Sequence, residues 1–251
     1  EKNKDKINIA LKYEDIIHNK NKGKISALLT IEEGGVAKGS LSHLRNYYRL
    51  GVRMLTLTWN HENEIAYPST SRKEAEKRQR YHRGLKEFGI KFIEEMEDLG
   101  MIIDVSHLSD QGVEDVLKYT RKPFVASHSN AREVCNHVRN LKDDLIKEMA
   151  NRGCVIGINL YPPFLKEEVD GRIEKGNIES IIHHIKHIIL VGGTECIGLG
   201  SDFDGISGHQ EIKDASYMPK LAQRLEDAGI SYNVIEKIFY KNFLNLYKEV
   251  L

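Results

Sequence analysis

Short apolar runs alternate with amphipathic stretches along the chain. The runs lie at residues 25–30, 52–57, 101–105, 123–126, 155–160 and 196–200. An unbroken apolar run is typical of a parallel strand that is buried on both faces. Between the runs, apolar residues recur at helical spacing, most clearly the isoleucines of residues 178–189. This β-α-β-α order predicts an α/β domain, either a barrel or a doubly wound sheet.

Two further features favour the barrel and a single domain. No G-x-G-x-x-G motif follows a strand, which disfavours a dinucleotide-binding sheet. The 251 residues are close to the ~250 of a TIM barrel. We find no linker, repeat or low-complexity segment, so we expect one domain over residues 1–251. The lysine-rich residues 1–6 and residues 19–24 are predicted to be solvated surface.

Charge and cysteine content limit the partners and the compartment. The chain has 37 Lys and Arg against 37 Asp and Glu, which gives a formal net charge of zero. This balance argues against nucleic acid or an anionic membrane as the main partner, and no apolar run approaches 18 residues. Cys135, Cys154 and Cys196 are scattered and form no C-x-x-C pair. We therefore expect a reducing, cytoplasmic location.

Four strands end in residues that can bind a metal or carry protons. The run at residues 25–30 leads to Glu32 and Glu33. The runs at 101–105 and 123–126 lead to His107 and His128, and the run at 196–200 leads to Asp202. In a barrel these ends open on one face, where active sites form. Two histidines with carboxylates suit Zn²⁺ or a similar divalent ion. Strand alternation lets only one of Glu32 and Glu33 face the site, and the pattern does not choose between them.

The remaining histidines carry no such signal. Three lie on the polar face of the isoleucine-striped helix, and five others have no strand-end position, so all eight are predicted to be ordinary surface residues. They are His183, His184 and His187 on the helix, and His18, His43, His82, His137 and His209 elsewhere.

The motifs at these strand ends resemble the membrane dipeptidase (renal dipeptidase) family of zinc hydrolases. They are Glu-Gly-Gly at 33–35, Leu-Thr-Leu-Thr at 55–58, Ile-Asp-Val-Ser-His at 103–107, Ser-His-Ser at 127–129 and Gly-Ser-Asp-Phe-Asp-Gly at 200–205. The resemblance extends from about residue 25 to the C-terminus. Residues 59–63 look more like bacterial members than mammalian ones.

The resemblance implies a TIM-like (β/α)8 barrel with two divalent metal ions, most often zinc, that share a bridging carboxylate. Glu33 matches the bridging glutamate, and His107 and His128 match ligands of the second metal. Asp202 matches the catalytic aspartate that handles the proton of the attacking water.

Substrate contacts also follow from the resemblance. Arg139 matches the arginine that binds the substrate's terminal carboxylate, and Tyr161 resembles a tyrosine that lines the pocket. Trp59 stands where better-known members have a histidine that stabilises the tetrahedral intermediate. His61, two residues further on, is the candidate to replace it.

A second departure concerns the first metal. The family holds it with a His-x-Asp motif on the first barrel strand, and this sequence contains no His-x-Asp. We count six strands, not eight, and loops at 61–83 and 162–177 account for the length. We therefore expect the chain to cover about six of the eight βα units, with two N-terminal units of ~30 residues each lying outside it.

The function implied is metal-dependent hydrolysis of small dipeptides, with tolerance of a C-terminal D-residue, by a protein that forms a homodimer as family members often do. Two alternatives remain. One is another amidohydrolase-like barrel hydrolase such as a lactonase or deaminase, although no lysine follows a strand end to bridge the metals. The other is a non-catalytic or mononuclear metal-binding barrel, which the missing His-x-Asp favours.

Overall fold

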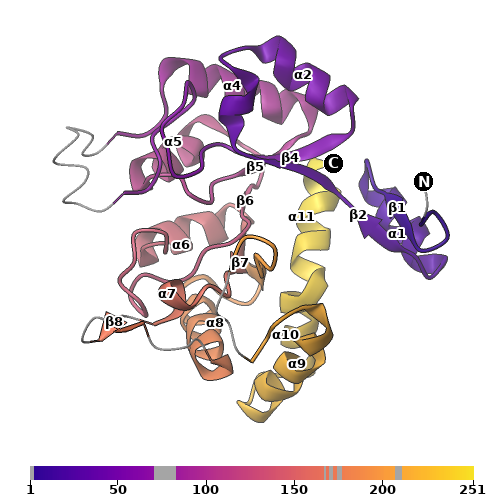
Figure 1. Cartoon of the computed structure of the whole chain (residues 1–251), viewed down its shortest axis with the longest axis vertical. Coiled ribbons are helices and arrows are strands. Elements are labelled where there is room, and N and C mark those ends of the chain that lie inside the picture. Colours follow the sequence, from indigo (N-terminus) through magenta and orange to yellow (C-terminus); the bar gives the residue numbers. More distant parts are fainter. Residues whose placement is uncertain (1–2, 71–82, 167, 170–171, 174–176, 207–210) are drawn as a thin grey trace. The chain divides into compact units, whose positions relative to one another are not determined.

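The computed structural model describes residues 3–70, 83–166, 168–169, 172–173, 177–206 and 211–251. The chain forms two compact units (Figure 1). Unit 1 consists of residues 1–68, 79–124 and 244–251, and unit 2 of residues 69–78 and 125–243. The expectation of a single domain over residues 1–251 stays a prediction.

Unit 1 is built on parallel strands in the order β3-β4-β5, and a separate parallel pair is formed by β1 and β2. Its elements are β1 (Ile7–Ile9), α1 (Tyr13–Asn21), β2 (Ile25–Ala27), β3 (Leu29–Glu32), the 3-10 helix η1 (Gly34–Ala37), α2 (Leu41–Arg49), β4 (Val52–Thr56), α4 (Glu87–Leu99), β5 (Ile102–Asp104), α5 (Asp110–Tyr119) and most of α11 (Asn242–Val250). The apolar stripe of α4 is buried through Phe92, Ile93 and Met96, and each such side chain contributes about 1.5–3 kcal/mol.

Unit 2 repeats this plan with parallel strands in the order β6-β7-β10. Its elements are β6 (Val125–Ala126), α6 (Asp143–Asn151), β7 (Val155–Ile158), α7 (Pro162–Leu165), the antiparallel pair β8 (Glu168–Val169) and β9 (Arg172–Ile173), α8 (Ile178–Gly192), β10 (Ile197–Leu199), η2 (Ala215–Tyr217), α9 (Met218–Asp227), α10 (Tyr232–Glu236) and the π-helical turn η3 (Lys237–Lys241). All six predicted strands are therefore present, and in each unit the strands that follow these βα units pair in parallel as expected.

The N-terminal strand and helix were not predicted. β1 and α1 precede the first expected strand, and β1 pairs in parallel with β2. The prediction that residues 19–24 are solvated surface is wrong for Asn19, which is 3% exposed. Its side chain accepts a hydrogen bond from Asn8 of β1 and donates one to Ser26 of β2, both at 3.0 Å. An amide that bridges two strands in this way has no apolar signature in the sequence.

His184 is a second correction. It lies on α8 and was predicted to be a surface residue, yet it is fully buried. Its Nδ1 accepts a hydrogen bond from the backbone N–H of Ala131 at 3.2 Å, so its Nε2–H donates to the carbonyl of Leu165, also at 3.2 Å. Burial is the main cause that lowers the pKa of His184 to about 4. The histidine therefore joins α8 to the loop that follows β6 and to the end of α7.

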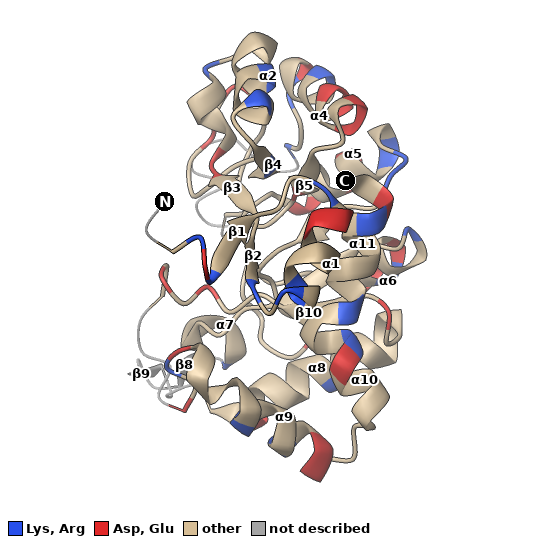
Figure 2. Ribbon diagram, turned by 90° about the vertical axis from the view of Figure 1, so that its right-hand side faces the viewer, with Lys and Arg blue, Asp and Glu red and all other residues tan. Residues whose placement is uncertain are grey.

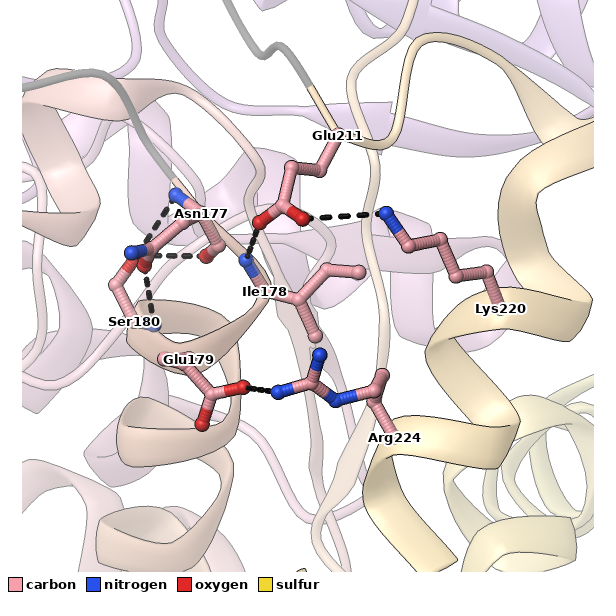
Figure 3. Close-up of polar contacts among 7 residues, drawn as sticks. All are labelled: Asn177, Ile178, Glu179, Ser180, Glu211, Lys220 and Arg224. Atoms are coloured by element: carbon pink, nitrogen blue, oxygen red, sulfur yellow. Dashed lines mark hydrogen bonds and ion pairs between the residues drawn. The ribbon is translucent and has the colours of Figure 1, made fainter. Parts of the chain in front are cut away.

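Charged residues of both signs share the helices. In the ribbon of Figure 2, acidic and basic residues are coloured on both α4 and α9. At the start of α8, Glu211 accepts a hydrogen bond from the Ile178 N–H at 2.8 Å and pairs with Lys220 of α9 at 3.1 Å (Figure 3). Arg224 of α9 pairs with Glu179. These contacts hold α9 against the N-terminus of α8.

Among the described residues, no helix is both long and apolar enough to cross a bilayer.

Candidate metal and substrate site

His107 lies on a tight turn that a buried carboxylate shapes. β5 ends at Asp104, whose side chain accepts hydrogen bonds from the Ser106 N–H at 3.0 Å and from the Thr56 hydroxyl at 2.6 Å. Just beyond this strand end the backbone of His107 takes a positive φ of 68°, a conformation that is uncommon without glycine. The turn holds the His107 ring in a largely buried position, with 8% of the residue exposed.

The ring of His107 is fixed at both nitrogens. Nδ1 lies 3.0 Å from the Oδ1 atom of Asn60, and Nε2 lies 3.4 Å from the Oε1 atom of Glu32. When the Nδ1–H of His107 donates a hydrogen bond to Asn60, the lone pair of Nε2 faces the carboxylate of Glu32. An amide or carbonyl on the second ring nitrogen is the usual way in which a metal-binding histidine is oriented.

The distance between these two atoms fits a shared metal ion. Zinc–nitrogen and zinc–oxygen bonds of about 2.1 Å place two ligands of a tetrahedral ion about 3.4 Å apart. The Nε2 atom of His107 and the Oε1 atom of Glu32 are 3.4 Å apart. The chemistry of the two donors and their spacing therefore fit a divalent cation.

Glu33 is the other carboxylate at this strand end, and its backbone is strained, with a φ of 137°. Its Oε1 atom accepts hydrogen bonds from the Gly35 N–H at 2.9 Å and from the Asn63 amide at 2.7 Å. A Cβ at Gly35 would lie 2.7 Å from that same oxygen. A Cβ at Gly34 would lie 2.5 Å from the Cδ1 atom of Ile65. The two glycines are thus needed for the glutamate to fold back over its own turn.

Asn63 holds this turn from the following loop. Its Oδ1 accepts the N–H groups of Ile65 and Ala66 at 2.8 and 3.1 Å, so its amide nitrogen points to Glu33 and to the carbonyl of Leu57. The structure thus places Glu32 beside His107 and ties Glu33 to the loop at Asn63. The assignment of Glu33 as the bridging ligand stays a prediction.

Trp59 lies close to His107, and His61 lies beside Trp59. The ring centre of Trp59 is 6.2 Å from that of His107 and 5.9 Å, edge to face, from that of His61. Trp59 is 43% exposed, and His61 is also exposed. The structure therefore brings Trp59 to the strand end that carries His107 and places His61 next to Trp59.

In unit 2, His128 follows β6 and is 9% exposed. Its Nδ1 atom lies 2.8 Å from the hydroxyl of Ser127. The neighbouring strand ends pack tightly here, because a Cβ at Gly157 or Gly200 would lie 2.1 or 1.9 Å from the carbonyl of Ser127. Glycine at these two positions is what allows the strand end that carries His128 to sit so close to β7 and β10.

Asp202 follows β10 with a positive φ of 61°. Its Oδ2 atom accepts a hydrogen bond from the side-chain amide of Asn159 at 3.1 Å. The backbone N–H of Gly205 donates to the Asp202 carbonyl at 3.0 Å and closes the turn. The carboxylate therefore lies at the end of β10 beside the end of β7, as strand-end placement predicts.

Arg139 and Tyr161 share an aromatic neighbour. The Arg139 guanidinium carbon lies 5.5 Å from the centre of the Phe164 ring, and the Tyr161 ring meets Phe164 edge to face at 5.0 Å. His137 packs on the same ring at 4.5 Å. Desolvation, then Arg139 and Arg132, lower the pKa of His137 to about 4. The histidine beside Arg139 is therefore uncharged at neutral pH. Arg139 itself is largely buried, with 7% of the residue exposed.

Sequence reasoning missed the asparagines of this site. Asn60 contacts His107, Asn63 contacts Glu33, and Asn159 contacts Asp202. Asn60 and Asn159 lie close to the end of a predicted strand, which is the one signal that could have marked them, whereas Asn63 lies further along its loop. Asparagine is common in loops, and so its presence there is uninformative without the contact.

Comparison with known proteins identifies relatives of the whole chain. The family model described as membrane dipeptidase (peptidase family M19) matches residues 1–251. An uncharacterised dipeptidase of Schizosaccharomyces pombe is 37% identical over 232 residues, which are 92% of this chain and 54% of that protein. Dipeptidase 3 of mouse is 33% identical over 237 residues, which are 92% of this chain and 45% of that protein. The chain spans about half the length of these curated relatives.

A solved structure has a similar fold. The metallopeptidase of Rhodobacter sphaeroides, bound to a phosphinate mimic of the dipeptide L-Ala-D-Ala, superposes with a TM-score of 0.89 at 25% identity, covering 99% of this chain and 70% of that one. This confirms the predicted fold class, an α/β TIM-like barrel of which these βα units form part. The relatives come from fungi, mammals and bacteria, so a specifically bacterial type stays a prediction. The family match over every residue, together with these relatives, shows that the chain belongs to the membrane dipeptidase family, peptidase family M19.

Proposed function

We propose that the protein is a metal-dependent dipeptidase that hydrolyses the peptide bond of small dipeptides. The observation that carries this proposal is the His107 and Glu32 pair, whose donor atoms stand 3.4 Å apart at the end of two parallel strands. Family membership supports the reaction, because relatives are named dipeptidases and a solved neighbour binds a dipeptide mimic.

The proposed metal ligands are His107, His128 and Glu33, with Glu32 as a further carboxylate beside His107. The donor set of imidazole and carboxylate suits zinc, and two ions are proposed from the family resemblance. A bound divalent ion polarises a carbonyl and brings the pKa of its water to about 7, which supplies a nucleophile at neutral pH.

The other residues handle protons and substrate. Asp202 takes a proton from the attacking water and gives it to the leaving amine, first as a general base and then as a general acid. Arg139 binds the free carboxylate of the substrate, for which a planar guanidinium fork is suited. Tyr161 and Trp59 line the pocket, and His61 is proposed to stabilise the oxyanion.

The size of the substrate follows from Arg139. A cation that binds the terminal carboxylate restricts the site to short peptides, and we propose that it accepts a D-residue at that end. We also propose a homodimer and a cytoplasmic location, the latter because Cys135, Cys154 and Cys196 are all buried thiols.

Metal analysis combined with a dipeptide panel tests the proposal. We expect the purified protein to retain zinc, to be stabilised by added zinc, and to hydrolyse L-Ala-L-Ala and L-Ala-D-Ala. His107→Ala should lose both the stabilisation and the turnover, whereas the exposed His183→Ala should lose neither. Absence of metal binding together with absence of turnover across the panel would reject the function.

A mononuclear, non-catalytic metal-binding barrel is the second candidate, because the chain contains no His-x-Asp motif. It predicts one metal ion per chain, bound with the same dependence on His107, and no hydrolysis of any dipeptide. The same metal analysis and panel therefore separate the two functions.

A further inference from the structure

We propose that Asn159 is the positioning residue for Asp202, because its buried amide holds one oxygen of that carboxylate in a fixed direction. The inference rests on the proposed role of Asp202 as the proton carrier. Asn159 directly follows β7 and is fully buried.

The orientation of the Asn159 amide is set by its neighbours. Its Oδ1 atom accepts the backbone N–H of Tyr161 at 2.6 Å. The oxygen of the amide is therefore occupied, and the NH2 group is the end that faces Asp202, with Nδ2 3.1 Å from Oδ2. A donor faces the carboxylate, as an ionised acid requires.

The backbone of Asn159 is held just as firmly. The side chain of Asn130, two residues beyond His128, accepts the Asn159 N–H and donates to the Asn159 carbonyl, both at 3.0 Å. Asn130 is itself fully buried. Its amide imitates a backbone pair and ties the end of β7 to the loop after β6, so Asn159 has little freedom to move away from Asp202.

The second oxygen of Asp202 is placed by the turn. The residue has a positive φ of 61°, and a Cβ on Gly205 would come within 2.4 Å of its Oδ1 atom. Asn159 therefore fixes the direction of the Asp202 carboxylate through Oδ2, and its donated hydrogen bond favours the ionised form that must accept the first proton.

The test replaces Asn159 with leucine, which keeps the volume and removes the donor. In protein labelled with ¹³C at aspartate side chains, the Asp202 signal is identified by its loss in Asp202→Asn. We expect Asn159→Leu to move the titration midpoint of Asp202 upward by about one pH unit. On L-Ala-D-Ala we expect kcat to fall about 10- to 100-fold and the acidic limb of the kcat profile to move in the same direction.

Asn242→Leu is the matched control. Asn242 is also buried, and its amide donates to the carbonyls of Thr194 and Ile197 at 2.8 Å. This variant loses two hydrogen bonds and should lose stability, yet leave the Asp202 midpoint in place. An unchanged midpoint in Asn159→Leu would overturn the inference. If instead Asp202→Asn keeps normal turnover with metal bound, the proposed role of Asp202 fails, which is a different result.

Discussion

The Nε2 atom of His107 lies 3.4 Å from the Oε1 atom of Glu32, the edge length of a zinc tetrahedron. Glu33, which the family resemblance names as the bridging ligand, instead has its Oε1 atom bound to Gly35 and Asn63. The two consecutive glutamates thus have different surroundings. One contacts the histidine directly, and the other is held rigidly by its own turn.

Substitution of Glu32 tests whether this contact serves a metal. Glu32→Gln keeps the shape and removes the charge, and we expect zinc affinity to fall about 10- to 100-fold. Calorimetric zinc titration measures the change. Glu64→Gln, an exposed change in the same unit, is the control. Zinc affinity equal in the Glu32 variant and the wild type would show that Glu32 takes no part in binding.

Arg139 should discriminate between free and blocked carboxylates. Arg139→Ala is expected to raise KM for free dipeptides about 10- to 100-fold, because a charge-assisted pair is lost. Peptide amides, which lack the anion, should be affected much less. Arg139→Lys should recover only part of the loss, since an ammonium group lacks the bidentate fork. Steady-state kinetics on matched acid and amide substrates provide the measurement. Equal KM increases for both substrates would argue against the carboxylate contact.

Stability should decline in mild acid because of His184. Its pKa is about 4 in the folded protein against 6.5 ordinarily, so the unfolded chain binds the extra proton between these values. Stability is therefore complete above pH 6.5 and falls as the pH drops towards 4, about tenfold in the folding equilibrium per pH unit. His137 adds to the same window.

His184→Gln isolates this contribution, because glutamine can still accept and donate but does not titrate. Urea unfolding at several pH values between 4.5 and 7 gives the free energy of unfolding as a function of pH. In His184→Gln the slope of this dependence should correspond to about one proton fewer than in the wild type. The exposed neighbour offers a matched control, and His183→Gln should keep the wild-type slope. An unaltered slope in His184→Gln would contradict the assignment.

Glu211 should affect the stability of the protein at a lower pH than His184 does. The hydrogen bond from the Ile178 N–H is the main cause that lowers its pKa below 4.5, with Lys220 adding to it (Figure 3). Its contribution is therefore present above pH 4.5 and lost as the pH falls through the lower folded value. Glu211→Gln should reduce Tm at pH 7 by at most about 2 °C, since the group is partly exposed, and the difference should shrink as the pH falls below 4.5. Thermal scans of Glu211→Gln and the exposed Glu249→Gln over a series of acidic pH values measure this. A difference that does not shrink with falling pH would speak against the carboxylate.

Gly34 should tolerate no side chain. Gly34→Ala would bring a methyl group against Ile65 Cδ1 and the Leu57 carbonyl, at 2.5 and 2.8 Å, and we expect a loss of about 1–3 kcal/mol. Adding Ile65→Val removes the first contact and should recover part of the loss in a urea-based double-mutant cycle. Additive losses would show that the two residues do not compete for space.

The strands and the two histidines could be predicted because buried parallel strands are continuous apolar runs, and His107 and His128 follow such runs closely. The choice between Glu32 and Glu33 could not be predicted from the strand pattern. Alternation assumes an extended backbone, and the φ of 137° at Glu33 breaks it. His184 was misplaced for a related reason: the helical period identifies its face, but not the loop N–H and carbonyl that approach it. The β1 strand escaped notice because it spans just Ile7–Ile9 and both of its isoleucines are exposed, so it lacks the buried apolar run of the other strands.

Four described residues other than glycine have a positive φ, and three of them are Glu33, His107 and Asp202. Glycine would adopt each of these backbone conformations without strain. Each of the three turns therefore carries a backbone strain that glycine would avoid. Under the roles proposed for Glu33, His107 and Asp202, the side chains at these turns trade backbone stability for chemistry, and selection for backbone strain alone would favour glycine at all three positions.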